Sequence, residues 1–417
     1  MKIKMLNTYH SFYAKVVCWS CLLVPALLLT TPNYSVAIIG FVILASIGYL
    51  IINKSELKLQ TFDKIVIFCL AWYFIGAIPI TIYDGETGRY FQGGVRLLAA
   101  IPIYLALIDL LKKKSLPIRK YLEVGVVIGS LGAFVLAYYQ FYFLQMHRVG
   151  GFLFSINFGY LACSLAFLSL SLSVKSSNKL WLTASFCLGI FSVVLSFTRG
   201  AIFAIPLLLV ILVIFHLKSI KPKLLTMGIL AFISVCFLSY HYSSTVKSRI
   251  DYTMAEFSSI SNGNIDNAVS SGDRLQYWFG AVEAFKQSPI FGLSFSERRE
   301  LNHQLFLEGK IEERASQVQR GHAHSQYFEL IASNGILGIV TIFTSLFIPL
   351  ILMILHYRKT SSDWALSGAI FVSGFAIFGL TEVLLTANLI GFFYGFMLCV
   401  FFAHISVEKH SKNTGLS

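Results

Sequence analysis

The chain has 417 residues, of which 56% are hydrophobic and 13% are charged, and its mean hydropathy is +0.72. A soluble domain of this size and composition would aggregate, which excludes soluble enzymes and soluble binding modules. The formal net charge at pH 7 is +13, and a chain of this kind must place that charge outside the bilayer. The composition therefore predicts an all-α polytopic membrane protein.

Apolar runs of roughly 20 residues, long enough to span a bilayer, predict about twelve membrane helices. We expect them near residues 16–30, 34–52, 64–82, 92–111, 121–143, 155–173, 179–197, 200–217, 223–240, 326–355, 364–381 and 385–404. The first run has a basic start but no convincing small-residue cleavage site, so we expect a retained helix rather than a signal peptide. These runs predict a membrane domain at 1–240, an extramembrane segment at 241–323 and further membrane helices at 324–417.

The basic residues alternate between the predicted loops as the positive-inside rule requires. With the amino terminus in the cytoplasm, 20 of the 33 Lys and Arg residues fall on the cytoplasmic side, and both termini are cytoplasmic. The short loops on the other side hold only Arg89, Arg148 and Arg199, with Arg96 just inside a helix. Much of the net charge is therefore a topology signal, which leaves no argument for binding DNA or RNA.

The two predicted faces also differ in the kind of basic residue. The cytoplasmic side has 18 Lys and 2 Arg, whereas the outer side has 10 Arg and 3 Lys. Arginine presents a planar fork of donors that suits phosphate or carboxylate, so the outer face is expected to bind an anion. Interfacial snorkelling and salt bridges to nearby glutamates are the alternative explanation for about half of these arginines.

The extramembrane segment 241–323 is expected to form a lid over the outer face. Its residues 258–272 are rich in Ser and Asn, which predicts a loop. The apolar positions of residues 273–287 fit one face of a helix, with a cap at Gly272-Asp273 and a stop at Ser288-Pro289. Residues 295–314 are more weakly amphipathic and are also expected to be helical.

Three residues are candidates for chemistry on this outer face. Arg199 lies in the tight connection Ser196-Phe-Thr-Arg-Gly-Ala, where its guanidinium and helix-end N–H groups could bind an anion. Arg274 opens the predicted lid helix, where the helix dipole would favour an acid over a base. His324 is expected at the beginning of the next helix, where neighbouring arginines would favour a neutral imidazole suited to general-base catalysis. An interfacial anchor for Arg199 and a hydrogen-bonded boundary residue for His324 are the structural alternatives.

Several classes of active site are missing from the sequence. It has no Walker-type loop, no HExxH, no Gly-x-Ser-x-Gly and no Asp-x-Asp motif. All seven cysteines lie within apolar runs, where Cys behaves as a small buried hydrophobe. Carboxylates are scarce on the outer face outside the lid, so we expect metal-free chemistry without a cofactor.

Three motifs of the sequence resemble those of the O-antigen ligase and polymerase superfamily. His324-Ser325, followed after nine residues by Gly335-Ile-Leu-Gly, resembles its histidine signature. The Arg199 connection resembles its first arginine motif, and Gly272-Asp-Arg274-Leu-Gln-Tyr-Trp with Ser288-Pro289 resembles its second. The doubled His322-Ala-His324 and the chain length are most similar to the O-antigen ligases. The resemblance covers about residues 180–340.

The resemblance implies a GT-C-like membrane glycosyltransferase of the Gram-negative inner membrane, acting at its periplasmic face. Such enzymes take a glycan from undecaprenyl pyrophosphate and join it to a sugar hydroxyl, without metal and with inversion; in the ligases the acceptor is lipid A core. Carried onto this sequence, His324 activates the acceptor hydroxyl, while Arg199 and Arg274 stabilise the leaving pyrophosphate.

The resemblance also suggests a second tier of substrate contacts. Arg148 and Arg96 are expected to contact phosphate or acceptor, and His322, with Arg320 beside it, to orient the base or bind acceptor. Glu382, in Gly379-Leu-Thr-Glu-Val, is expected to hold an arginine or contact sugar.

Other functions remain open at the level of sequence. An O-antigen polymerase shares these motifs but joins lipid-linked repeats. A protein oligosaccharyltransferase is a further alternative, although those relatives are usually longer. A transporter of lipid-linked glycans is the alternative from another class, and it predicts inverted repeats that this sequence does not contain.

Overall fold

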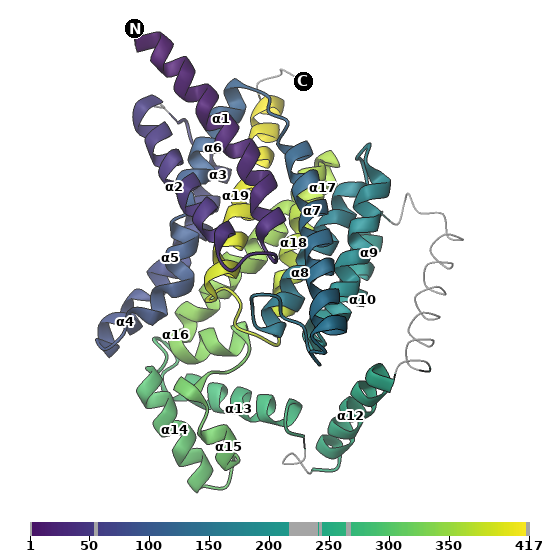
Figure 1. Cartoon of the computed structure of the whole chain (residues 1–417). Coiled ribbons are helices and arrows are strands. Elements are labelled where there is room, and N and C mark those ends of the chain that lie inside the picture. The colour runs from purple at the N-terminus through teal and green to yellow at the C-terminus, as the bar shows by residue number, and fades with distance from the viewer. Residues whose placement is uncertain (1, 54–56, 217–240, 242–243, 264–267, 414–417) are drawn as a thin grey trace. The chain divides into compact units, whose positions relative to one another are not determined.

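The computed structural model describes residues 2–53, 57–216, 241, 244–263 and 268–413, and throughout these residues the regular elements are helices, with no strand (Figure 1). The predicted all-α class is therefore confirmed for the described chain. Contacts between residues divide the chain into two compact units. The first unit is Met1–Leu209 with Leu337–Ser417, and the second unit is Val210–Ile336. The predicted segments 1–240, 241–323 and 324–417 distinguish membrane helices from an extramembrane segment. Contacts between residues do not test this distinction.

The helices of the first unit follow the apolar runs of the sequence. In chain order they are α1 (Lys2–Leu27), α2 (Tyr34–Asn53), α3 (Thr61–Gly76), α4 (Ile78–Asp84), the 3₁₀ turn η1 (Gly88–Phe91), α5 (Gln92–Leu98), α6 (Ile101–Lys113), α7 (Ile118–Tyr138), the π-helical turn η2 (Tyr139–Phe143), α8 (Ser155–Ser173), α9 (Lys179–Leu195), α10 (Arg199–His216), the π-helical turn η5 (Phe343–Phe347), α17 (Ile348–Thr360), α18 (Asp363–Phe378) and α19 (Asn388–Asn413). Both α10 and α16 (Gln326–Ile342) cross from one unit into the other along the chain.

Eight helical stretches in the described residues are long and apolar enough to cross a membrane. Three more apolar helices are shorter, namely Lys179–Leu195, Arg199–Phe215 and Asp363–Phe378. Together they match eleven of the predicted runs, while the run predicted at 223–240 lies outside the described residues. The chain is thus a polytopic membrane protein by composition and helix length, and the count of twelve spans stays a prediction.

Small residues allow the helices of the first unit to approach closely. Gly125 and Gly129 of α7 face α1, where a Cβ on either residue would collide with the backbone carbonyl of Leu22 or Pro25. In a bilayer, where the hydrophobic effect does not drive helix association, such close backbone packing is a main source of stability. Helices α8 and α19 are the most enclosed, with 78% and 83% of their spanning windows buried, so they form the interior of the unit.

The second unit consists of shorter helices around a small apolar core. Its helices are α12 (Ser244–Ser261), α13 (Ser271–Gln287), α14 (Phe295–Leu307), α15 (Glu313–Ser316), the 3₁₀ turn η4 (Gln319–Gly321) and the first part of α16. Its core is formed by Ala281, Ala284, Leu293, Leu301, Leu305, Ile311, Ala315, Ala323 and Ala332.

The helices predicted in the segment 241–323 are confirmed, with corrections at their ends. Helix α13 stops at the predicted Ser288, but it begins at Ser271 with Ser270 as the N-cap, so the predicted cap at Gly272-Asp273 is wrong. The predicted helix at 295–314 is divided into α14 and α15. Helix α12 was not predicted, and its last residues occupy the beginning of the predicted loop at 258–272.

Candidate functional site

The two histidines of the second unit lie in a turn between η4 and α16, which we call the histidine turn (residues 320–326). Arg320 and His324 both have left-handed backbone conformations, with φ of 59° and 47°, although neither is glycine. Helix α16 begins at Gln326, so His324 precedes the helix that it was expected to begin. Such conformations cost free energy and persist only where surrounding contacts fix them.

A buried ion pair, which we call the clamp, fixes this turn. The Arg298 Nη1 atom lies 2.7 Å from one carboxylate oxygen of Glu329, and Arg298 Nη2 lies 3.2 Å from the other. The same guanidinium donates to the carbonyl of Gly321, and the Ala323 N–H donates to Glu329 Oε2 at 2.8 Å. The clamp therefore satisfies the backbone immediately before His322 and immediately before His324.

Local sequence places both members of the clamp. Ser294 and Glu297 form a capping box at the start of α14, with the Ser294 N–H 2.8 Å from Glu297 Oε2, and this puts Arg298 in the first turn. Glu329 lies in the first turn of α16, and Ser333, one turn later, accepts a hydrogen bond from Arg298 at 2.7 Å. Because both charged groups are buried and paired, losing either partner would leave an uncompensated charge in the interior.

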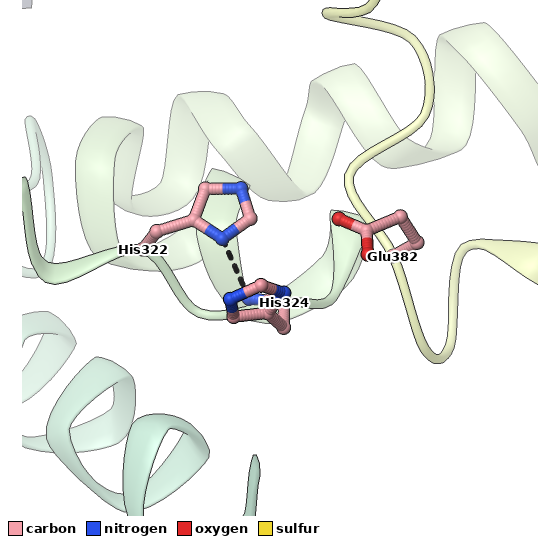
Figure 2. Close-up of side chains that lie close together, drawn as sticks. All are labelled: His322, His324 and Glu382. Atoms are coloured by element: carbon pink, nitrogen blue, oxygen red, sulfur yellow. Dashed lines mark hydrogen bonds between the residues drawn. The ribbon is translucent and has the colours of Figure 1, made fainter. Parts of the chain in front are cut away.

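The side chains of His322 and His324 are fixed relative to each other (Figure 2). The His324 backbone N–H donates to His322 Nδ1 at 3.2 Å, and the ring centroids are 4.4 Å apart at 84°. A nitrogen that accepts a hydrogen bond carries no proton, so a neutral His322 is protonated on Nε2.

Helix α13 supports the ring of His324 and carries Arg274. The rings of Tyr277 and His324 are stacked with centroids 5.5 Å apart, and burial, followed by the charge of Asp273, raises the pKa of Tyr277. Arg274 lies one helical turn before Tyr277, on the same side of α13. Tyr277 thus stacks on His324 and lies one helical turn from Arg274 along α13.

Arg274 has no counter-charge among the described residues, because its neighbouring carboxylate is occupied. Both oxygens of Asp273 accept from Arg314, at 2.6 to 3.0 Å, and this hydrogen bonding raises the pKa of Arg314. Arg320, the other predicted arginine of this unit, lies 6.0 Å from the ring centroid of Phe295. The guanidinium of Arg274, half-buried at the beginning of a helix, is therefore available to an anionic ligand.

In the first unit, Arg199 is the first residue of α10 and is half-buried. The turn before it is fixed by a hydrogen bond of 2.8 Å from Thr198 Oγ1 to the Ser155 carbonyl, and Phe197 has a φ of 49°. After it, Gly200 packs so closely on Tyr160 and Thr381 that a Cβ would collide with both hydroxyl groups. Arg199 thus stands at the N-terminus of an 18-residue helix, a position that favours anions.

The other predicted residues of the first unit are Arg148, Glu382 and Arg96. Arg148 and Glu382 lie on loops near the turn before Arg199, and Arg96 lies on α5. Thr381, which bonds Tyr160 at 2.6 Å, precedes Glu382, whose Oε1 accepts from the Val383 N–H at 3.1 Å. Arg148 is exposed, and its Nε lies 3.5 Å from the Ser196 carbonyl. These contacts bring together the residues next to Arg199 and Glu382, and Arg148 itself, at the ends of α8, α9 and α18.

Arg96 has a structural role that the sequence did not predict. Its Nη1 donates to the carbonyls of Gln92 and Thr386, at 2.5 and 2.7 Å, and its Nε donates to Asn388 at 3.3 Å. Arg96 therefore anchors the far end of the loop that carries Glu382. Its expected contact with phosphate or acceptor stays a prediction.

Sequence reasoning missed Arg298, Glu329 and Tyr277. Glu329 carried a usable signal, because a carboxylate in an apolar helix is costly and has to find a partner. Arg298 resembled the other charged residues of α14, and only its burial distinguishes it.

Comparisons with known proteins found one family model and two similar proteins. The family model described as O-antigen ligase matches residues 184–343, a segment that contains Arg199, Arg274, the clamp and the histidine turn. An uncharacterized protein of Haemophilus influenzae is 25% identical over 319 residues, which cover 74% of this chain and 78% of that protein. An O-antigen ligase of Escherichia coli K12 is 23% identical over 331 residues, which cover 76% of this chain and 74% of that protein. These findings support membership of the chain in the O-antigen ligase and polymerase superfamily.

Proposed function

We propose that this protein is an O-antigen ligase, which transfers O-antigen polysaccharide from undecaprenyl pyrophosphate to a sugar hydroxyl of lipid A core. The reaction takes place at the periplasmic face of the inner membrane of a Gram-negative bacterium. The observation that carries the proposal is the histidine turn, in which a buried ion pair fixes the backbone around His324 and the ring of Tyr277 stacks on its side chain.

In the proposed reaction, His324 removes the proton from the acceptor hydroxyl as its oxygen attacks the anomeric carbon of the donor. The new C–O bond forms on the face opposite the phosphate, so the anomeric configuration inverts. The bond between the anomeric carbon and the phosphate oxygen breaks, and undecaprenyl pyrophosphate leaves with the electron pair. Its growing negative charge requires fixed positive groups.

Arg274 and Arg199 are the proposed pyrophosphate contacts. Arg274 is supported by its lack of a counter-charge among the described residues, and Arg199 by its place at the beginning of α10. His322 and Arg320 are proposed to contact the acceptor, while Arg148 and Glu382 are proposed to contact donor phosphate or sugar. No metal or cofactor is assigned a role in this reaction.

The proposal is tested by deleting the gene in a bacterium that makes smooth lipopolysaccharide. We expect lipid A core without O-chain, together with accumulated undecaprenyl-linked polymer. Core that carries a single repeat would instead establish a polymerase. Loss of lipid-linked glycan from the periplasmic leaflet, with transfer intact in disrupted membranes, would establish a transporter and overturn both enzyme assignments.

A further inference from the structure

A basic cavity lies at one end of the first unit, apart from the residues discussed above. It has a volume of about 690 Å³, and its lining includes Lys64 of α3, Lys359 of α17 and Lys409 of α19. Each lysine lies near the end of an apolar span: Thr61–Asp84, Gln326–Thr360 and Asn388–Ser411. The cavity therefore lies where the polar headgroups of one leaflet meet the protein.

None of the three ammonium groups is ion-paired in the described part of the chain. No acidic residue lines the cavity, and none in the described residues forms an ion pair with these lysines. The ammonium of Lys409 lies 4.0 Å from the ring centroid of Phe62, which fixes its position without removing its charge.

The carboxylates next to Lys64 and Lys409 in the sequence are already hydrogen-bonded to other residues. Glu408 accepts from His356 at 2.8 Å and from Ser362 at 3.0 Å. Asp63 is fully buried and accepts from Tyr104 at 2.8 Å and Ser406 at 2.6 Å. An external anion is therefore the missing partner of the lysines.

Apolar side chains extend from the cavity along the membrane-facing surface of the unit. On α3, Lys64 is followed by exposed Ile65 and, one turn further, by exposed Phe68. On α17, exposed Ile351 and Leu355 precede Lys359. A ligand with an anionic head and long acyl chains fits this pattern, whereas a soluble anion would use only the cavity.

We infer that this cavity binds the phosphate headgroup of an anionic phospholipid, with the acyl chains lying along α3 and α17. The lysines belong to the side predicted to face the cytoplasm, where basic pockets between membrane helices bind such headgroups. The inference is independent of the proposed glycosyl transfer, because it concerns other residues and a different ligand.

The test uses the purified full-length protein in detergent and measures lipid binding by native mass spectrometry. The probes are phosphatidylglycerol, zwitterionic phosphatidylcholine and soluble glycerol phosphate. We expect preferential binding of phosphatidylglycerol, weakened about 30-fold by the double variant Lys64→Gln/Lys359→Gln, since each basic residue contributes roughly fivefold. Lys409 is left unchanged because it packs on Phe62.

The matched control is Lys120→Gln/Lys179→Gln, which removes the same charge from exposed lysines outside the cavity. We expect this variant to bind phosphatidylglycerol like the parent protein. Equal loss in both double variants would indicate attraction to the surface as a whole and overturn the inference. Unchanged binding in the cavity variant, or displacement of phosphatidylglycerol by equimolar glycerol phosphate, would also overturn it.

Discussion

At the scale of single residues, His324 combines an unfavourable backbone conformation with closely fixed surroundings. Its φ of 47° is unusual for a residue other than glycine, and the cost is offset by the hydrogen bonds of the adjacent backbone to the clamp. A general base acts efficiently only when its ring is fixed within hydrogen-bond reach of the proton. A rigid imidazole is therefore the property that the histidine turn supplies.

His324→Ala should lower glycosyl transfer by about 100- to 10,000-fold, the usual contribution of a general base. Transfer from lipid-linked polymer to purified lipid A core measures the effect, with thermal unfolding in detergent as a check on folding. The control is His303→Ala, since His303 is exposed on α14. Full activity of a folded His324→Ala protein would contradict the assignment.

The clamp gives a second prediction at this scale. Glu329→Leu leaves Arg298 buried without its counter-charge, and should cost about 3–5 kcal/mol of folding stability. The surface pair of exposed Lys286 and half-buried Glu283, at 2.7 Å, supplies the control, because Glu283→Gln should change stability by at most about 1 kcal/mol. Thermal unfolding measures both effects.

A double variant separates stability from positioning. Arg298→Met/Glu329→Leu buries no charge, so it should regain most of the lost folding stability. It still leaves the Gly321 carbonyl and the Ala323 N–H without their partners, so kcat should stay low while KM for the donor changes little. If kcat recovered together with folding stability, the role of the clamp would be purely structural.

At the scale of the element, α16 is interrupted by Gly335, whose φ and ψ are 56° and −136°. Side chains with a Cβ are essentially excluded from this conformation. The break frees the Ile336 N–H to donate to the Pro289 carbonyl at 2.8 Å, and the Leu293 N–H bonds the Ala332 carbonyl at 2.8 Å. The connection between α13 and α14 is thereby attached to the helix that follows the histidine turn.

Gly335→Ala should therefore destabilise the protein by about 1–3 kcal/mol, because of backbone strain and a Cβ placed 2.5 Å from the Ile290 carbonyl carbon. Gly40→Ala, with open space around its Cβ and a helical position in α2, should be neutral or slightly stabilising. Thermal unfolding compares the two. Equal thermal stability of the two variants would show that the break in α16 is not required for stability.

At the scale of the whole molecule, the alternation of basic loops predicts opposite membrane sides for the second unit and for the connection between α6 and α7. The test is labelling with a membrane-impermeant maleimide, after Cys187 and Cys236 have been replaced by Ser. Lys310→Cys should react in spheroplasts, whereas Ser115→Cys should react only after lysis. The reverse pattern would refute the predicted orientation.

Much of the architecture could be predicted because its causes are local. A run of roughly 20 apolar residues forms a membrane helix whatever surrounds it, and Ser288-Pro289 ends α13 through its own backbone restrictions. The beginning of α13 was predicted wrongly because Ser270, Gly272 and Asp273 are all acceptable caps by residue type. Choosing among them depends on tertiary contacts, such as the pairing of Asp273 with Arg314.

The sequence by itself determined the all-α membrane class, most helix positions and the motifs that contain Arg199, Arg274 and His324. Only the tertiary structure decided how the histidine turn is supported, because Arg298 and Glu329 are 31 residues apart and pair through the packing of α14 on the turn. It also decided the left-handed backbone of His324 and the use of Arg96 as an anchor. Hydropathy and helix caps act over a few residues, whereas a buried charge is stable only where a distant partner folds against it.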